Sequence, residues 1–101
     1  MTKRLGIYVT SDQHMDKVLE VCRAARKKGV ETHVFFTHTG TRLCVDPRME
    51  ELRELASVAL CKVGFEGQSM DPSQAKLEPR ACASQAWHAE MIYDCDRYLT
   101  F

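Results

Sequence analysis

The sequence has no excess of charge of either sign. Fourteen Lys and Arg residues balance fourteen Asp and Glu residues, so the formal net charge at pH 7 is zero. Proteins that bind nucleic acid through its phosphates carry a basic face, which this composition does not provide. The local basic cluster at residues 23–28 falls in the last turns of a predicted helix, where cations complement the helix dipole. We therefore expect no nucleic-acid partner.

Long apolar runs and a secretory leader are also lacking. No uninterrupted apolar stretch approaches the ~20 residues that a membrane-spanning helix requires. From Met1 the chain passes within a few residues into a predicted strand, without the apolar core and cleavage site of a signal peptide. We expect no membrane partner and a cytoplasmic location.

Closely spaced cysteine pairs are absent. The chain has an odd number of cysteines, and no two of them stand in a C-x-x-C arrangement. Disulfide scaffolds use an even number of cysteines, and structural zinc sites use close ligand pairs. A reduced protein with one or more reactive thiols fits this pattern better. The cysteines are Cys22, Cys44, Cys61, Cys82 and Cys95.

The chain does contain a regular alternation of strand and helix patterns. Runs of β-branched, aromatic and small apolar residues predict strands over residues 5–10, 32–37, 57–63 and 97–101. The intervening segments predict a helix that ends at Gly29, one that starts at Asp46–Pro47, a short one from Asp71, and one over about 81–94. Residues 38–41 are expected to form a loop between the second strand and the second helix.

The first predicted helix has the clearest amphipathic pattern. Thr10, Ser11 and Asp12 offer N-cap side chains, and Gly29 suits the position after its end. The apolar positions recur at spacings of three and four residues, which predicts one buried face. That face consists of Met15, Val18, Leu19, Cys22 and Ala25. The corresponding face of the last predicted helix consists of Ser84, His88, Met91, Ile92 and Cys95.

Alternating strands and helices predict a single α/β domain over residues 1–101, a three-layer αβα fold around a small doubly wound parallel sheet of four to five strands. We expect the first strand at the centre, with the second on one side and the third on the other. Ligands bind such sheets at the carboxyl edge, where the strand order reverses. This order would place Cys61 opposite the loop 11–14, whose helix N-terminus favours an anion and stabilises a thiolate.

Several segments resemble the DsrE/DsrF-like family of small sulfur-relay proteins. Residues 5–11 resemble the family's first strand and loop, and residues 34–43 resemble its second strand and glycine loop. Cys61, within residues 58–64, matches the cysteine at the end of the third strand. Residues 96–101 are similar to the last strand. Members often have a serine three residues after the cysteine, where this chain has Gly64.

The resemblance implies a persulfide carrier or sulfurtransferase of flavodoxin-like fold, with Cys61 as the catalytic thiol. Such a protein takes sulfane sulfur from a donor protein and passes it to an acceptor protein, without a cofactor or a metal. The family also implies a homo-oligomer, a trimer or a hexamer. The predicted edge strand 97–101 and a surplus of aromatic side chains near the sheet margins favour an interface as well.

Five further residues are candidates for supporting roles at the same edge. His14 and His38 lie in predicted loops, where an imidazolium would stabilise a thiolate. Ser11 and Gly40 lie in the loops whose backbone N–H groups face an anion. Cys44 precedes the Asp46 cap and is the second candidate for a reactive thiol.

Three other interpretations remain open on the sequence. The protein is a non-catalytic DsrE-like binding or regulatory subunit of a sulfur-metabolism complex if Cys61 is unreactive. The Thr/Gly loop 38–41 resembles the phosphate cradle of flavodoxins and would suit FMN, although it follows the second strand rather than the first. A metal site would draw its ligands from the set His33, His38, Cys44, Cys61 and His88.

Overall fold

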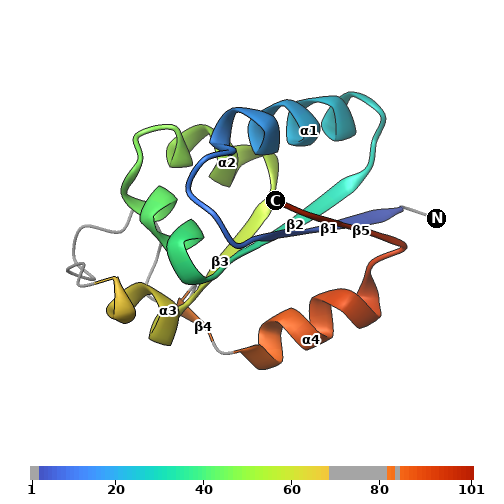
Figure 1. The fold of residues 1–101 in the computed structure, drawn as a ribbon. Coiled ribbons are helices and arrows are strands. Elements are labelled where there is room, and N and C mark those ends of the chain that lie inside the picture. The colour runs from blue at the N-terminus through green and yellow to red at the C-terminus, as the bar shows by residue number, and fades with distance from the viewer. Residues whose placement is uncertain (1–2, 69–81, 84) are drawn as a thin grey trace.

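A five-stranded parallel sheet lies at the centre of the computed structural model, which describes residues 3–68, 82–83 and 85–101 (Figure 1). Its spatial order is β4-β3-β2-β1-β5. The strands are β1 (Arg4–Val9), β2 (Glu31–Phe36), β3 (Ser57–Cys61), β4 (Cys82–Ala83) and β5 (Arg97–Thr100). The predicted class, a small doubly wound parallel α/β sheet, is confirmed.

The strand order differs from the predicted one. β1 lies between β2 and β5, so that Ile7 pairs with Val34 on one side and Leu99 on the other. β3 follows β2 on the side away from β1, and the chain reverses only between β4 and β5. The switch point is therefore between β1 and β5, and β2 separates Cys61 from β1. The expected position of Cys61 opposite the loop 11–14 is wrong.

The described helices cover both faces of the sheet (Figure 1). They are α1 (Met15–Lys27), the 3-10 helix η1 (His38–Val45), α2 (Met49–Leu55), α3 (Lys62–Gly67) and α4 (Gln85–Asp94). α1 and α2 lie on one face and α4 on the other. Two successive right-handed crossovers in the same direction leave both helices on one face, which accounts for the observed order of β1, β2 and β3. No helix in the described ranges is long and apolar enough to span a bilayer.

Some elements were not predicted from the sequence. Residues 38–41 are the first turn of η1 rather than a loop, and α3 begins directly after β3. The two-residue strand β4 was also missed, and the predicted last helix starts at Gln85 rather than near residue 81. The helix expected from Asp71 lies outside the described residues.

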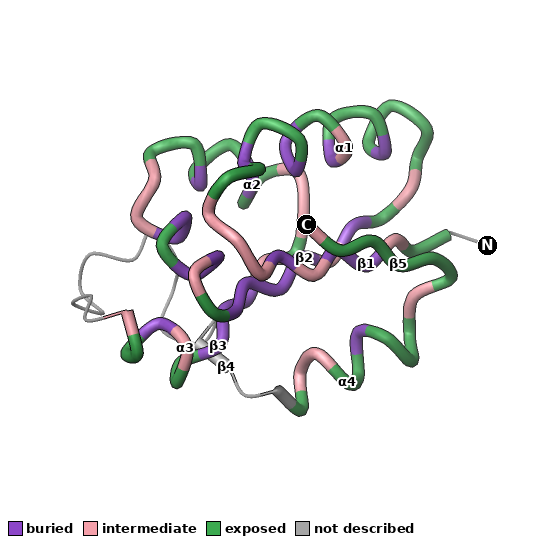
Figure 2. The backbone as a smooth tube through the Cα atoms, viewed as in Figure 1, coloured by how far each residue is buried: buried purple, intermediate pink, exposed green. Residues whose placement is uncertain are grey.

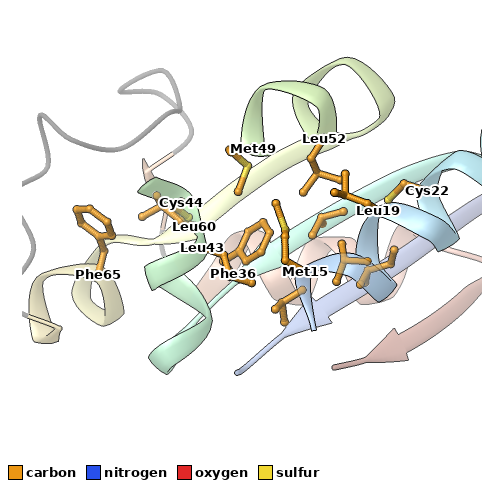
Figure 3. Packing of buried hydrophobic residues seen from close by; sticks show 14 residues of the cluster. Met15, Leu19, Cys22, Phe36, Leu43, Cys44, Met49, Leu52, Leu60 and Phe65 are labelled. Atoms are coloured by element: carbon orange, nitrogen blue, oxygen red, sulfur yellow. The ribbon is translucent and has the colours of Figure 1, made fainter. Parts of the chain in front are cut away.

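The larger core cluster fills the space between the sheet and the α1–α2 layer (Figure 3). All five residues of the predicted α1 face are buried there or beside it. Figure 2 shows the buried residues concentrated on the central strands and on the inner sides of the helices. Arg23 forms two hydrogen bonds with the carboxylate of Glu51, which joins α1 to α2. The local helix pattern was therefore sufficient to define this face.

The C-terminal end of α1 agrees with the prediction, and its N-terminal end does not. Gly29 has a φ of +72°, the left-handed conformation expected just beyond a helix. The N-cap is His14, rather than Thr10, Ser11 or Asp12, and its side chain forms no capping hydrogen bond. The chain needs these residues to cross from the end of β1 to the helix layer, so the predicted cap lies too early.

The α4 face of the sheet carries a smaller cluster that contains Cys61. Phe35, Ala59, Cys61 and Met91 are buried in it, with Tyr8, Trp87 and Cys95 packed against them. The His88 ring stacks on Tyr8 with centroids 3.8 Å apart, and its Nε2 is hydrogen-bonded to the Tyr98 hydroxyl. Ile92, which was expected on this face, is 50% exposed. The inward side of α4 instead includes Trp87, which the periodicity had not indicated.

Cys22, on the inner side of α1, provides a test of this packing through the pH dependence of stability. Burial raises the pKa of the Cys22 thiol to about 11, and a hydrogen bond with Thr32 opposes this only in part. A cysteine in an unfolded chain has a pKa of about 8.5. Between these two values the unfolded chain loses the proton and the folded protein keeps it, so stability falls as the pH rises.

We expect the urea midpoint of the protein to decrease from about pH 8.5 to about pH 11. The Cys22→Ala variant should be less stable throughout, yet its midpoint should decrease less steeply over that range. Burial raises the pKa of Tyr98 to about 12, so this residue contributes part of the pH dependence that remains in Cys22→Ala. An equally steep decline in Cys22→Ala would contradict the buried thiol as its source.

Candidate functional site

Cys61 is the last residue of β3 and the N-cap of α3. Its side chain is on the α4 face of the sheet and the residue is 6% exposed. The Gly64 backbone N–H donates a hydrogen bond to Cys61 Sγ over 3.4 Å. A cysteine at an N-cap can accept this bond because the residue three positions later presents a free N–H at the start of a helix. The thiol therefore lies at the carboxyl edge of the sheet, as predicted, with a hydrogen-bond donor directed at its sulfur.

The missing side chain at Gly64 has a local reason. A Cβ atom at this position would lie 3.1 Å from the His38 backbone nitrogen and 3.6 Å from Cys61 Sγ. The contact with the His38 nitrogen is tighter than side chains ordinarily make, so a larger residue would require η1 to shift, whereas the contact with Cys61 Sγ is an ordinary one. The sequence contains a signal for the Cys61 hydrogen bond, since Gly64 stands three residues after Cys61 at N-cap spacing.

His38 brings the beginning of η1 next to α3. Its backbone has a φ of +51°, an uncommon conformation for a residue with a side chain. Thr41 Oγ1 donates a hydrogen bond to the His38 carbonyl over 2.7 Å and also contacts the Gly64 carbonyl at 3.5 Å. The His38 side chain itself is exposed. Of the predicted supporting residues, His38 is thus the one whose backbone borders the Cys61 turn.

Gly40 is required by packing against β1. A Cβ atom there would lie 2.5 Å from the Val9 carbonyl oxygen, closer than real side chains approach a backbone atom. Two hydrogen bonds hold the start of η1 against the end of β1. Thr39 Oγ1 donates to the Thr10 carbonyl, and the Thr37 N–H donates to the Val9 carbonyl. Gly40 is itself buried. This contact accounts for a glycine at position 40 of η1.

Ser11 and His14 lie at the other end of the edge, beside β5. The hydroxyl of Ser11 is buried and has no hydrogen-bond partner among the described residues. The exposed His14 ring lies 6.4 Å from the Phe101 ring. The Thr10 N–H and hydroxyl both bond to the Phe101 carbonyl, so this end of the edge belongs to the β1–β5 switch point. The structure therefore does not bring Ser11 and His14 together with Cys61.

The other described cysteines have different surroundings. Cys44 and Cys22 are fully buried in the cluster on the opposite face of the sheet from Cys61. Cys95 is partly buried, and burial followed by the nearby carboxylate of Asp94 raises the pKa of its thiol. No disulfide joins any two of the four described cysteines, and the side chain of Cys82 lies outside the described residues. Cys61 is thus the described thiol at the carboxyl edge.

The proposed metal ligands are not gathered into one place. No three His, Cys, Asp or Glu side chains in the described ranges come close enough to hold a metal ion. His33 is bound to Glu31 at 3.0 Å, and His88 is bound to Tyr98.

The fold and this edge define a doubly wound α/β protein with a buried thiol at the end of an inner strand. No protein-family model matches the chain, and the search of curated proteins found no match either.

Proposed function

We propose that the protein is a persulfide carrier of the DsrE/DsrF-like kind, acting as a sulfurtransferase in a cytoplasmic sulfur relay. The observation that carries the proposal is the Gly64 N–H directed at Cys61 Sγ at the carboxyl edge of the sheet. A hydrogen bond to a negatively charged acceptor is stronger than one to a neutral acceptor, so the same N–H would bond to the sulfur of a persulfide anion on Cys61. The nucleophilic form of cysteine is the thiolate.

The transfer needs two exchange steps at Cys61. In the first, the Cys61 thiolate attacks the outer sulfur of a donor persulfide, and the donor leaves as a thiolate when its S–S bond breaks. In the second, an acceptor thiolate attacks the outer sulfur now held on Cys61, which returns Cys61 to the thiolate. Each step forms one S–S bond and breaks one, so the relay consumes no oxidant or reductant.

Two features support a protected carrier. Cys61 is 6% exposed, which limits contact between bound sulfur and water. Cys22 and Cys44 belong to the cluster on the other face of the sheet, so they are not placed to remove the sulfur by forming a disulfide with Cys61. Neither Cys22 nor Cys44 would therefore compete with a partner thiol for the persulfide on Cys61.

The proposal includes a homo-oligomer, a trimer or a hexamer, because β5 is an exposed edge strand. All four of its residues are exposed, including Leu99 at 41%. β5 pairs with β1 on one side and has no described strand on the other. Open backbone groups on such an edge pair readily with another chain.

A second candidate function is favoured by the same burial of Cys61. A thiol that is 6% exposed can be an inert core residue, in which case the protein is a non-catalytic binding or regulatory subunit. The two candidates differ in whether Cys61 acquires sulfur, which one experiment decides.

We expect the wild-type protein to gain one sulfur atom after incubation with polysulfide, and Cys61→Ser to gain none. Cys95→Ser, which removes the other described thiol on the α4 face, is the matched control and should gain sulfur as the wild type does. Native mass spectrometry measures the added sulfur and the number of subunits together. Sulfur that persists in Cys61→Ser would refute the carrier. A folded wild type that gains no sulfur would favour the non-catalytic subunit.

A further inference from the structure

A cavity of about 200 Å³ lies between α4 and the sheet, towards the amino ends of β1 and β2. It is separate from Cys61, which stands at the carboxyl end of β3. Trp87, Met91, Cys95 and His33 are among the residues that line it. Glu90, Asp94 and Arg4 complete the lining.

Met91 and Trp87 give the cavity an apolar side. Met91 is 4% exposed and belongs to the core of this face. The Trp87 ring is fixed against Phe35, with centroids 5.5 Å apart and planes 20° from parallel. An apolar cavity of about 150 Å³ is large enough to bind benzene, so this one has room for a single ring or a short alkyl chain.

The charges around the cavity are not balanced. Arg4 Nε lies 3.4 Å from Glu31, and His33 Nε2 lies 3.0 Å from the same carboxylate, so one acid serves both basic groups. Glu90 and Asp94 also line the cavity, yet neither forms an ion pair or hydrogen bond with another described residue. Among the described residues, the rim therefore carries two carboxylates, Glu90 and Asp94, without a basic partner.

These two carboxylates are unfavourable for α4 itself. Glu90 and Asp94 are four residues apart, a spacing at which like charges destabilise a helix. Asp94 is the last residue of α4, where the helix dipole favours a cation, and the last turn holds no basic residue. Residues that lower the stability of the fold, with no contact that compensates for them, are expected at functional sites. A bound cation would reverse both penalties.

We propose that this cavity binds a small primary amine that carries an aromatic or apolar group. The ammonium is held by the Glu90 and Asp94 carboxylates at the rim, and the apolar group packs against Trp87 and Met91. An ammonium beside a tryptophan face gains cation–π attraction as well. An anionic ligand would meet the two carboxylates, and a neutral one would leave them unmatched.

Trp87 is the only tryptophan in the sequence, so its fluorescence reports directly on the cavity. We expect phenethylamine to change this fluorescence in a saturable way at neutral pH and to raise the melting temperature. Phenethyl alcohol and phenylpropionate have similar shapes but are neutral and anionic, and both should bind at least about fivefold more weakly. Equal binding of the three compounds, or no saturable response to phenethylamine, would overturn the proposal.

The double variant Glu90→Gln, Asp94→Asn tests the carboxylates. We expect it to bind phenethylamine at least about fivefold more weakly and to melt at a higher temperature than the wild type without ligand. The control Glu50→Gln, Glu66→Gln removes the same charge from α2 and α3 and should bind as the wild type does. Unchanged affinity in the cavity variant would refute the site. Cys61→Ser should bind the amine normally, so the result does not depend on sulfur transfer.

Discussion

Replacing Phe36 by alanine is expected to lower the free energy of unfolding by about 3–5 kcal/mol. Phe36 is 0% exposed and lies in the cluster between the sheet and the α1–α2 layer, beside Met15 and Leu43 (Figure 3). The change removes the transfer free energy of the ring and leaves a cavity that close-packed neighbours fill only in part. Urea unfolding followed by circular dichroism measures the loss.

Tyr93→Ala is the matched control for Phe36→Ala. Tyr93 is 90% exposed on the outer side of α4, so removal of its ring should change stability by less than about 0.5 kcal/mol. Because domains of this size are stable by about 5–15 kcal/mol, Phe36→Ala is expected to unfold at a much lower urea concentration. Two variants with similar midpoints would contradict the assigned core.

Gly40→Ala is expected to destabilise the protein by about 1–3 kcal/mol. Its methyl group would lie 2.5 Å from the Val9 carbonyl oxygen, which belongs to the inner strand β1 and cannot move without disturbing the sheet. In a domain of about 100 residues, each kcal/mol corresponds to about 4–8 °C in melting temperature. Differential scanning calorimetry measures this decrease directly.

Gly67→Ala provides the contrasting glycine. It ends α3, and a Cβ atom there would meet nothing within 4 Å. Alanine restricts the unfolded chain more than glycine does, so we expect Gly67→Ala to raise stability by about 0.4–1 kcal/mol. A decrease in both variants would indicate a general cost of losing glycine rather than the contact with Val9.

Local patterns in the sequence were sufficient for some elements and insufficient for their arrangement. The face of α1 from Met15 to Ala25 could be predicted because its period reflects the geometry of one helix. The position of β3 in the sheet could not be predicted, because it depends on which face of the sheet α2 packs against. That choice rests on contacts between distant residues such as Arg23 and Glu51, which no local pattern encodes.

The same limit applied to the candidate site. The position of Cys61 at the end of a strand followed from the apolar run before it. The residue that lies beside Cys61 could not be predicted in this way. Because β2 is next to β3, that residue is His38 rather than Ser11 or His14. The sequence predicts a loop over residues 38–41 and a strand that ends before Gly64, so it assigns neither glycine to a helix. In the folded protein both are helical, and a Cβ atom would lie 2.5 Å from the Val9 carbonyl oxygen at Gly40 and 3.1 Å from the His38 nitrogen at Gly64.

The pairing of β1 with β5 has a consequence for synthesis of the protein. Residues 4–9 and 97–100 are separated by most of the chain. β1 therefore cannot pair with β5 until nearly the whole polypeptide has been synthesised. A ribosome adding about 5–20 residues per second needs roughly 5–20 s to make the segment between them. During that interval one side of β1 has open N–H and C=O groups, which can pair with strands of other nascent chains. Until β5 emerges, β1 is the part of the polypeptide that a chaperone would need to shield.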